Sequence, residues 1–110
     1  MKQHTYRITV EHLADKDGQA PATPARLQFD VGNHDEVIGL IERMRSRGDF
    51  DPETASAFAL GLKLFGEVLL THRDHPLFTD FAPHFGAFMK HLKGRAPQGD
   101  AAAAAAPAQN

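Results

Sequence analysis

The chain opens with two stretches in which polar and apolar residues alternate. A period of two, rich in β-branched and aromatic types, predicts half-buried strands over residues 4–13 and 26–31. The six apolar positions that share one side of these strands are Tyr6, Ile8, Val10, Leu27, Phe29 and Val31. Residues 14–25 are rich in helix and strand breakers, with Asp17-Gly18 as the expected turn. The pattern therefore predicts an antiparallel hairpin with a wide loop.

After the second strand the apolar residues recur with a helical period. The first helix is predicted to start at Asn33, because Glu36 three residues later completes a capping box, and to end at Gly48. Asp51-Pro52 predicts the start of a second helix that runs to about Arg73. The third helical region spans residues 75–94, either as one kinked helix or as two short collinear helices that meet at Pro83.

The second helix is predicted to be the centre of the fold, because apolar residues cover most of its sides. Its clear polar strip consists of Ser56, Lys63 and Glu67. Gly61 lies within the apolar arc, so we expect another backbone to approach the helix there. The predicted fold class is α+β: an N-terminal antiparallel β-hairpin packed on one face by two to four α-helices, in the order β-β-α-α-α. We expect a single domain over residues 1–94 and a disordered Ala/Pro-rich tail over residues 95–110.

Composition narrows the function classes. The net charge of −2 is the opposite of the basic excess that nucleic-acid binding requires, so nucleic acid is an unlikely partner. The absence of cysteine excludes disulfides, thiolate catalysis and Cys-containing zinc sites, and fits a reducing compartment. The N-terminus shows no apolar signal segment, and charges interrupt the apolar stretches. We therefore expect a cytoplasmic protein with no membrane partner.

Several blocks of sequence resemble one known family. They are YRITVEHL, LQFDV, NHDEV, RGDFD and GLKLFGEVLL followed by HPLF. In this order and spacing they are similar to the bacterial family called domain of unknown function 3861, over roughly residues 4–93. The resemblance implies a compact bacterial domain and brings no activity and no catalytic residues with it.

Seven histidines raise the question of a metal site. His72 and His75 are three residues apart, but Pro76 disfavours helical geometry at His75 and no further ligand follows nearby. His84 and His91 share one edge of the third helical region and are too far apart along it for one ion, roughly 10 Å at 1.5 Å per residue. We therefore expect no metal site.

No catalytic or cofactor signature is recognisable. The two serines, Ser46 and Ser56, lie in predicted helices without a nucleophile elbow. The glycines of Gly61–Gly66 have the spacing of a phosphate loop but lack its Lys-Ser/Thr ending and lie inside a helix. We expect no catalytic residue and no cofactor, and whether the chain is an enzyme stays open, with a non-catalytic role favoured.

Arg43, Arg45 and Arg47 form the one basic cluster. Steps of two residues scatter the three side chains around a helix, so they make no continuous stripe for a phosphate backbone. At the end of a helix they complement its dipole, and this structural role is favoured over nucleic-acid binding.

Eight phenylalanines are the strongest compositional feature, and four of them repeat along the third helical region. Core packing is the default for such a stripe, although the same residues could form a surface for a partner or an apolar ligand. These candidate site residues are Phe78, Phe81, Phe85 and Phe88. The leading hypothesis is a non-catalytic homo-oligomeric or partner-binding module, with a homodimer through a hairpin edge. The alternatives are a small-molecule binder or enzyme with a Phe-lined pocket and, less favoured, a nucleic-acid binder.

Overall fold

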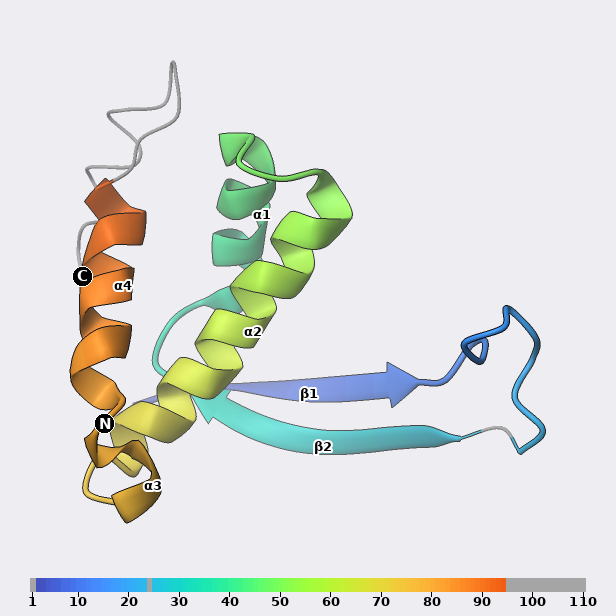
Figure 1. Ribbon diagram of the computed structural model, residues 1–110, viewed down its shortest axis with the longest axis horizontal. Coiled ribbons are helices and arrows are strands. Elements are labelled where there is room, and N and C mark those ends of the chain that lie inside the picture. The colour runs from blue at the N-terminus through green and yellow to red at the C-terminus, as the bar shows by residue number, and fades with distance from the viewer. Residues whose placement is uncertain (1, 24, 95–110) are drawn as a thin grey trace. The chain divides into compact units, whose positions relative to one another are not determined.

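The computed structural model describes residues 2–23 and 25–94 and has two strands followed by four helices (Figure 1). The elements are β1 (His4–Glu11), β2 (Arg26–Asn33), α1 (Val37–Arg47), α2 (Pro52–Thr71), α3 (Pro76–Thr79) and α4 (Ala82–Gly94). This order confirms the α+β class. The chain divides into two compact units, a hairpin unit that ends at Asp35 and a helical unit that begins at Glu36. The single domain over residues 1–94 and the packing of helices on one face of the hairpin stay predictions, and the predicted tail lies outside the described residues.

β1 and β2 pair antiparallel along their whole length, from His4 opposite Asn33 to Glu11 opposite Arg26. β1 is two residues shorter than predicted and β2 two residues longer. The loop turns where Asp17-Gly18 was expected. The Asp15 carboxylate accepts hydrogen bonds from the amides of Asp17 and Gln19, each at 2.9 Å. Gly18 has a φ of 83°, a conformation that glycine adopts without steric cost.

α1 begins four residues later than the sequence predicted. Glu36 is its N-cap, and the Glu36 carboxylate accepts hydrogen bonds from the amides of Ile38 and Gly39. Asn33 instead ends β2, where its side-chain oxygen accepts from the Asp35 amide at 2.9 Å. The capping-box prediction was wrong because Asn33 stabilises the turn that leaves the sheet, a use of asparagine as common as helix capping. Gly48, with a φ of 87°, ends α1 as predicted.

α2 starts as the sequence indicated. Asp51 is the N-cap, and its carboxylate accepts from the Thr54 amide at 3.3 Å, with Pro52 in the first turn. Hydrogen bonds from the Thr54 side chain and amide lower the pKa of Asp51 below its usual value. The helix ends at Thr71, slightly before the predicted Arg73.

The buried side of α2 differs from the predicted one. Ala55 and Ala59 are among its most deeply buried residues, which indicates that neighbouring segments come close to the helix backbone there. Glu67 belongs to the predicted polar strip but is buried, whereas Val68, from the predicted apolar side, is exposed. At the other end of the strip, the Ser56 hydroxyl accepts a hydrogen bond of 2.8 Å from Arg45 of α1, so this end also faces a neighbouring helix.

The close contact expected at Gly61 is found at Gly66 instead, and it comes from a side chain. A methyl group built at Gly61 would meet no described atom within 4 Å, so the predicted close approach is absent there. At Gly66 the same methyl would lie 3.6 Å from two ring atoms of Phe85 in α4. Gly66 is therefore the glycine at which α4 packs closely on α2.

α2 is long and apolar enough, by length and composition, to cross a membrane. In this chain α1 packs along it, and phenylalanines of α3 and α4 pack against its phenylalanines. It also carries Lys63 and Glu67 in its second half, and charges at such positions oppose insertion. Its neighbours make it the central helix of the helical unit.

The third helical region is two helices, the second of the predicted alternatives, but they do not meet at Pro83. α3 ends at Thr79 and α4 begins at Ala82. Pro83 therefore lies in the first turn of α4, where its missing N–H removes no helical hydrogen bond. The break falls before the proline, since the first turn of a helix accepts proline without a kink.

Arg47, the last residue of α1, forms a buried ion pair with Asp49 and also reaches α4 within the helical unit. The side chains of Arg47 and Asp49 are only 10% and 9% exposed, and Arg47 Nε lies 3.0 Å from Asp49 Oδ1. That contact is electrostatic, while Arg47 Nη2 donates to Asp49 Oδ2 and Nη1 donates to the Leu92 carbonyl, each at 3.3 Å. The guanidinium thus reaches one of the last carbonyls of α4, at the negative end of its dipole.

Candidate functional site

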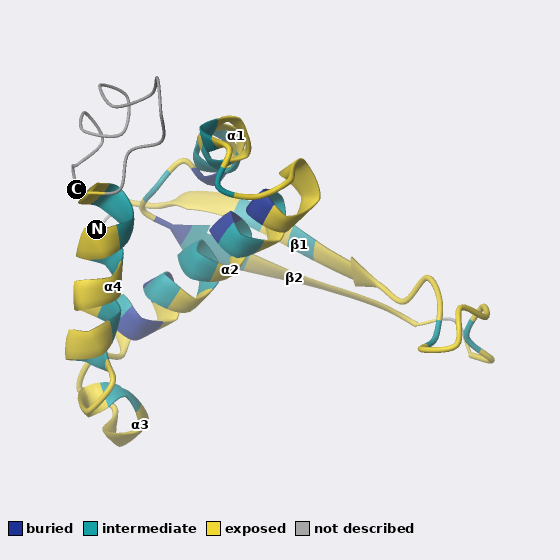
Figure 2. Cartoon of the chain, turned by 45° about the horizontal axis from the view of Figure 1, so that its top comes forward, coloured by how far each residue is buried: buried dark blue, intermediate teal, exposed yellow. Residues whose placement is uncertain are grey.

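The hairpin has one apolar side and one polar side. The register aligns its apolar residues in three cross-strand pairs on the same side: Tyr6 with Val31, Ile8 with Phe29, and Val10 with Leu27. The pairs nearest the loop are the most exposed, with 61% exposure at Leu27, 54% at Val10 and 42% at Phe29 (Figure 2). Solvent-exposed apolar side chains gathered on one side of a small sheet are typical of an interaction surface.

The polar side of the hairpin satisfies its own charges and amides. Arg7 forms a two-point ion pair with Asp30, with Nε to Oδ1 at 2.9 Å and Nη2 to Oδ2 at 3.3 Å. This pairing with Asp30 raises the pKa of Arg7. In the next row Gln28 donates to the Thr9 hydroxyl at 3.1 Å. The polar side is therefore a solvated surface, as the alternation predicted.

Both strands of the described sheet are edge strands. Within residues 2–23 and 25–94 it consists of β1 and β2 alone, so the outer edge of each has no strand partner. Unpaired strand edges present a row of backbone donors and acceptors to any other extended chain. The structure thus places an amphipathic surface and two open edges on the same element.

The four phenylalanines of the predicted site pack against α2. Phe65 of α2 lies at the centre of three of them, with ring centroids 6.0 Å from Phe78, 5.9 Å from Phe81 and 5.4 Å from Phe85. Phe88 instead packs edge-on against Phe58 at 6.3 Å. Edge-to-face and tilted rings at these distances stabilise a core.

The rings of this aromatic cluster thus hold α3 and α4 to α2. Phe81 and Phe88 are also partly exposed, so a partner surface at these two residues stays a prediction.

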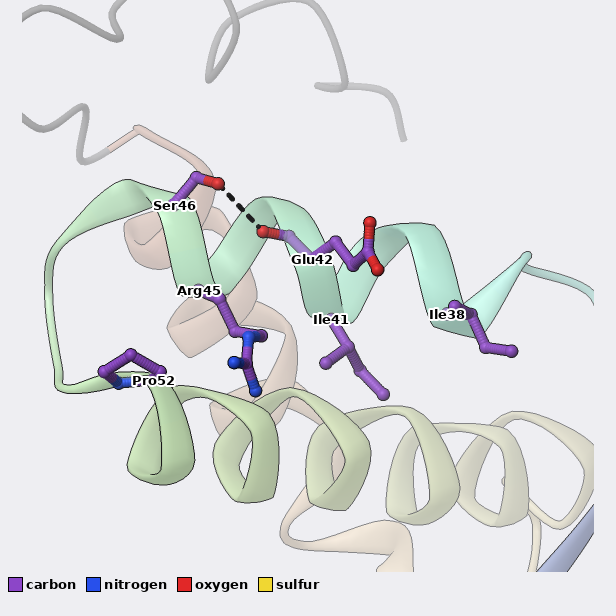
Figure 3. A pocket seen from close by; sticks show the side chains of 6 residues that line it. All are labelled: Ile38, Ile41, Glu42, Arg45, Ser46 and Pro52. Carbon is purple, nitrogen blue, oxygen red and sulfur yellow. Dashed lines mark hydrogen bonds between the residues drawn. The ribbon is translucent and has the colours of Figure 1, made fainter.

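An open groove lies elsewhere, between α1 and the start of α2 (Figure 3). Its volume is about 500 Å³, and its lining residues are Ile38, Ile41, Glu42, Arg45, Ser46 and Pro52. Ser46 donates its hydroxyl to the Glu42 carbonyl at 3.1 Å, within its own helix. The Ser46 hydroxyl is therefore engaged within α1 and not with a group across the groove.

The histidines that suggested a metal site take part in helix ends. The His75 ring accepts the Leu77 amide at 3.0 Å and caps α3. His72 Nδ1 lies 3.1 Å from the Val68 carbonyl at the end of α2. Among the residues that the structure describes, no three histidine or acidic side chains come together as an ion would require.

The basic cluster is divided between different contacts. Arg45 donates to Ser56, and Arg47 is buried against Asp49 and Leu92. Arg45 and Arg47 thus have structural contacts within the helical unit, while the expectation about nucleic acid stays a prediction.

The comparisons with known proteins agree with the fold. Residues 4–94 match a domain of unknown function with a solved structure, DUF3861. The chain belongs to this family. The crystal structure of a protein of unknown function from Pectobacterium atrosepticum is 39% identical to this chain. The match covers 86% of this chain and 100% of that chain, with a TM-score of 0.73. No curated protein matches the chain.

Membership of DUF3861 confirms the resemblance carried by the sequence blocks, and it brings no activity. The feature that the sequence reasoning left unassigned is which backbone groups of the hairpin face outward. The sequence does place Arg26 and Asp30 symmetrically about Gln28 in the second strand. Whether the backbone groups of these residues face outward depends on the hydrogen-bond phase of the ladder, which only the structure supplies.

Proposed function

We propose that this chain is a non-catalytic self-association module whose hairpin is completed by a second copy of the chain. The observation that carries the proposal is the two-stranded sheet with open edges and an exposed apolar side at Val10, Leu27 and Phe29. An isolated two-stranded hairpin is marginally stable in water, whereas three or more strands with an apolar face are stable. A second copy supplies the missing strands.

Symmetry explains why a second copy suits this surface. A two-fold axis perpendicular to the sheet pairs one edge with itself and keeps both apolar sides on the same side of a four-stranded sheet. The exposed residues of one copy then lie beside those of the other. Each copy also satisfies the backbone groups of one edge, which removes an aggregation risk.

The non-catalytic part of the proposal is supported by how the reactive side chains are used. Ser56 donates its hydroxyl to the Pro52 carbonyl at 2.8 Å and accepts from Arg45. His75 caps a helix, and Ser46 bonds within α1. A catalytic serine or histidine needs its oxygen or nitrogen directed at a base or a substrate instead.

The test is the mass of the full-length chain in solution. Light scattering and sedimentation are expected to give about twice the monomer mass of 12.0 kDa at micromolar concentration. The melting temperature is expected to rise with protein concentration, since association stabilises the folded state by mass action. A monomer at every concentration, with a constant melting temperature, refutes the proposal.

A further inference from the structure

We infer that the pairing edge is β2 and that the two-fold axis of the dimer passes at Gln28. This inference rests on the proposed function and specifies its interface. It makes Arg26, Gln28 and Asp30 the residues that hydrogen-bond between the two copies, through their backbone groups.

The hydrogen-bond phase of the hairpin decides which residues can pair outward. The His12 amide donates to the Ala25 carbonyl at 3.1 Å, one pair beyond the end of the ladder. Because bonded and non-bonded pairs alternate in an antiparallel ladder, Val10 with Leu27 and Ile8 with Phe29 exchange hydrogen bonds inside the hairpin. The residues between them turn their N–H and C=O groups to the outer edge.

On β2 the outward-facing residues are Arg26, Gln28, Asp30 and Gly32, and the first three carry the argument. With a two-fold axis at Gln28, each Gln28 faces its copy and Arg26 faces Asp30 of the second copy. All three positions then fall in bonded pairs, which gives roughly six main-chain hydrogen bonds between the copies. A register shifted by one residue would place residues whose N–H and C=O groups face inward at the interface. The hydrogen-bond phase excludes that shift and allows the register centred on Gln28.

The charges on the polar side fit the same register. Arg7 and Asp30 are opposite each other within one hairpin, as are Glu11 and Arg26. Pairing through β2 produces a row across four strands that alternates in sign: Arg7 and Asp30 of one copy, then Arg26 and Glu11 of the other. Opposite charges side by side on a sheet stabilise it.

The apolar side distinguishes β2 from β1. A two-fold axis at Thr9 would pair the β1 edges with an equally alternating row of charges, so charge favours neither edge. Pairing through β2 places Leu27 beside Phe29 of the second copy, and both are exposed. Pairing through β1 places Ile8, which is already half-buried, beside Val10. The β2 interface therefore removes more exposed apolar surface from water, which favours association.

Single cysteines test the register, because the chain contains no cysteine of its own. Gln28→Cys and Thr9→Cys occupy opposite positions in the hairpin and serve as matched variants. In the inferred dimer the two residues 28 are roughly 5 Å apart, while the two residues 9 are separated by three strand spacings, roughly 14 Å. A short bismaleimide linker is expected to give a covalent dimer with Gln28→Cys as the main product and little with Thr9→Cys.

The other outcomes of the cross-linking experiment separate failure of the inference from failure of the proposed function. A covalent dimer from Thr9→Cys alone overturns the choice of edge and leaves the proposed function standing. A dimer by light scattering that neither variant cross-links overturns the hairpin interface. A monomer at all concentrations, even if the β2 edge binds a strand of another protein, refutes both the inference and the proposed function.

Proline provides a second test that needs no cross-linking. The amides of Gln28 and Thr9 both point outward, so Gln28→Pro and Thr9→Pro remove no hydrogen bond inside the hairpin. Gln28→Pro is expected to abolish the dimer at concentrations where Thr9→Pro still dimerises, as measured by sedimentation. Equal effects of the two prolines, or a stronger effect of Thr9→Pro, refute the β2 assignment.

Discussion

The helical unit and the hairpin unit satisfy their side chains in different ways. The helical unit encloses an ion pair, packs its phenylalanine rings against one another and caps its helices with its own side chains. The hairpin unit pairs its charges but leaves much of its apolar side in solvent. The difference indicates that the stability of the helical unit is internal; under the proposed function, that of the hairpin depends on a second copy. Predictions that separate internal from concentration-dependent stability test this contrast.

The largest effect is expected at the buried ion pair. Arg47→Met removes the guanidinium that pairs with the buried Asp49 carboxylate, which lowers the free energy of unfolding by about 3–5 kcal/mol. Urea unfolding measures the loss, which should be the same at low and high protein concentration because the pair lies inside the helical unit. The control is Arg43→Met on the same helix, where the exposed side chain should change stability by less than about 0.5 kcal/mol. Equal losses in the two variants would contradict an enclosed pair.

A matched pair of phenylalanines compares the two units directly. Phe65 is 38% exposed and contacts three other rings, so Phe65→Ala should lower the free energy of unfolding by roughly 2–3 kcal/mol, below the cost at a fully buried site. Phe29→Ala in the hairpin should have a smaller effect, and that effect should grow with protein concentration. Chemical unfolding at two concentrations tells them apart. If the loss of unfolding free energy caused by Phe29→Ala does not depend on protein concentration, the proposed contrast between the two units is refuted.

The sequence predicted most of the fold because its local signals are strong. Alternation placed both strands, Gly48 and Asp51 marked helix ends, and Pro76 marked the start of α3. The start of α1 was missed, since Asn33 caps turns and helices equally well.

The candidate site was less predictable. The phenylalanine spacing identified the residues, but not that three of them pack around Phe65 and the fourth packs on Phe58. Burial of Glu67 and the close approach at Gly66 depend on which neighbour faces each side of α2. Periodicity gives the phase of a helix and says nothing about its surroundings.

Two glycines of the helical unit should respond in opposite directions. Gly48 has a positive φ that a side chain would strain, so Gly48→Ala should lower the free energy of unfolding by about 1 kcal/mol. Gly61 lies inside α2 with open space around it, so Gly61→Ala should raise it by up to about 1 kcal/mol. Thermal unfolding measures both changes. Destabilisation by Gly61→Ala would mean that a neighbouring segment does approach α2 there.

The smallest effect is expected at the cap of α2 and depends on pH. The pKa of Asp51 is lowered in the folded chain by its bonds with Thr54, so the carboxylate stabilises the fold above its unfolded-state pKa near 3.8. This stabilisation is lost as the pH falls through the lower folded-state pKa. The difference in melting temperature between the parent chain and Asp51→Ala should therefore shrink in acid. A difference that stays constant down to about pH 2 would contradict a role for the ionised form.

The ion pair between Arg47 and Asp49 also limits how this family can diverge. A change at one of these two positions alone breaks an enclosed ion pair, so relatives are expected to keep both residues or to replace both together with apolar ones. Leu92 takes part only through its backbone carbonyl, and this contact allows any residue except one that displaces the carbonyl. An alignment of family members should accordingly show that positions 47 and 49 covary, while position 92 varies independently of them.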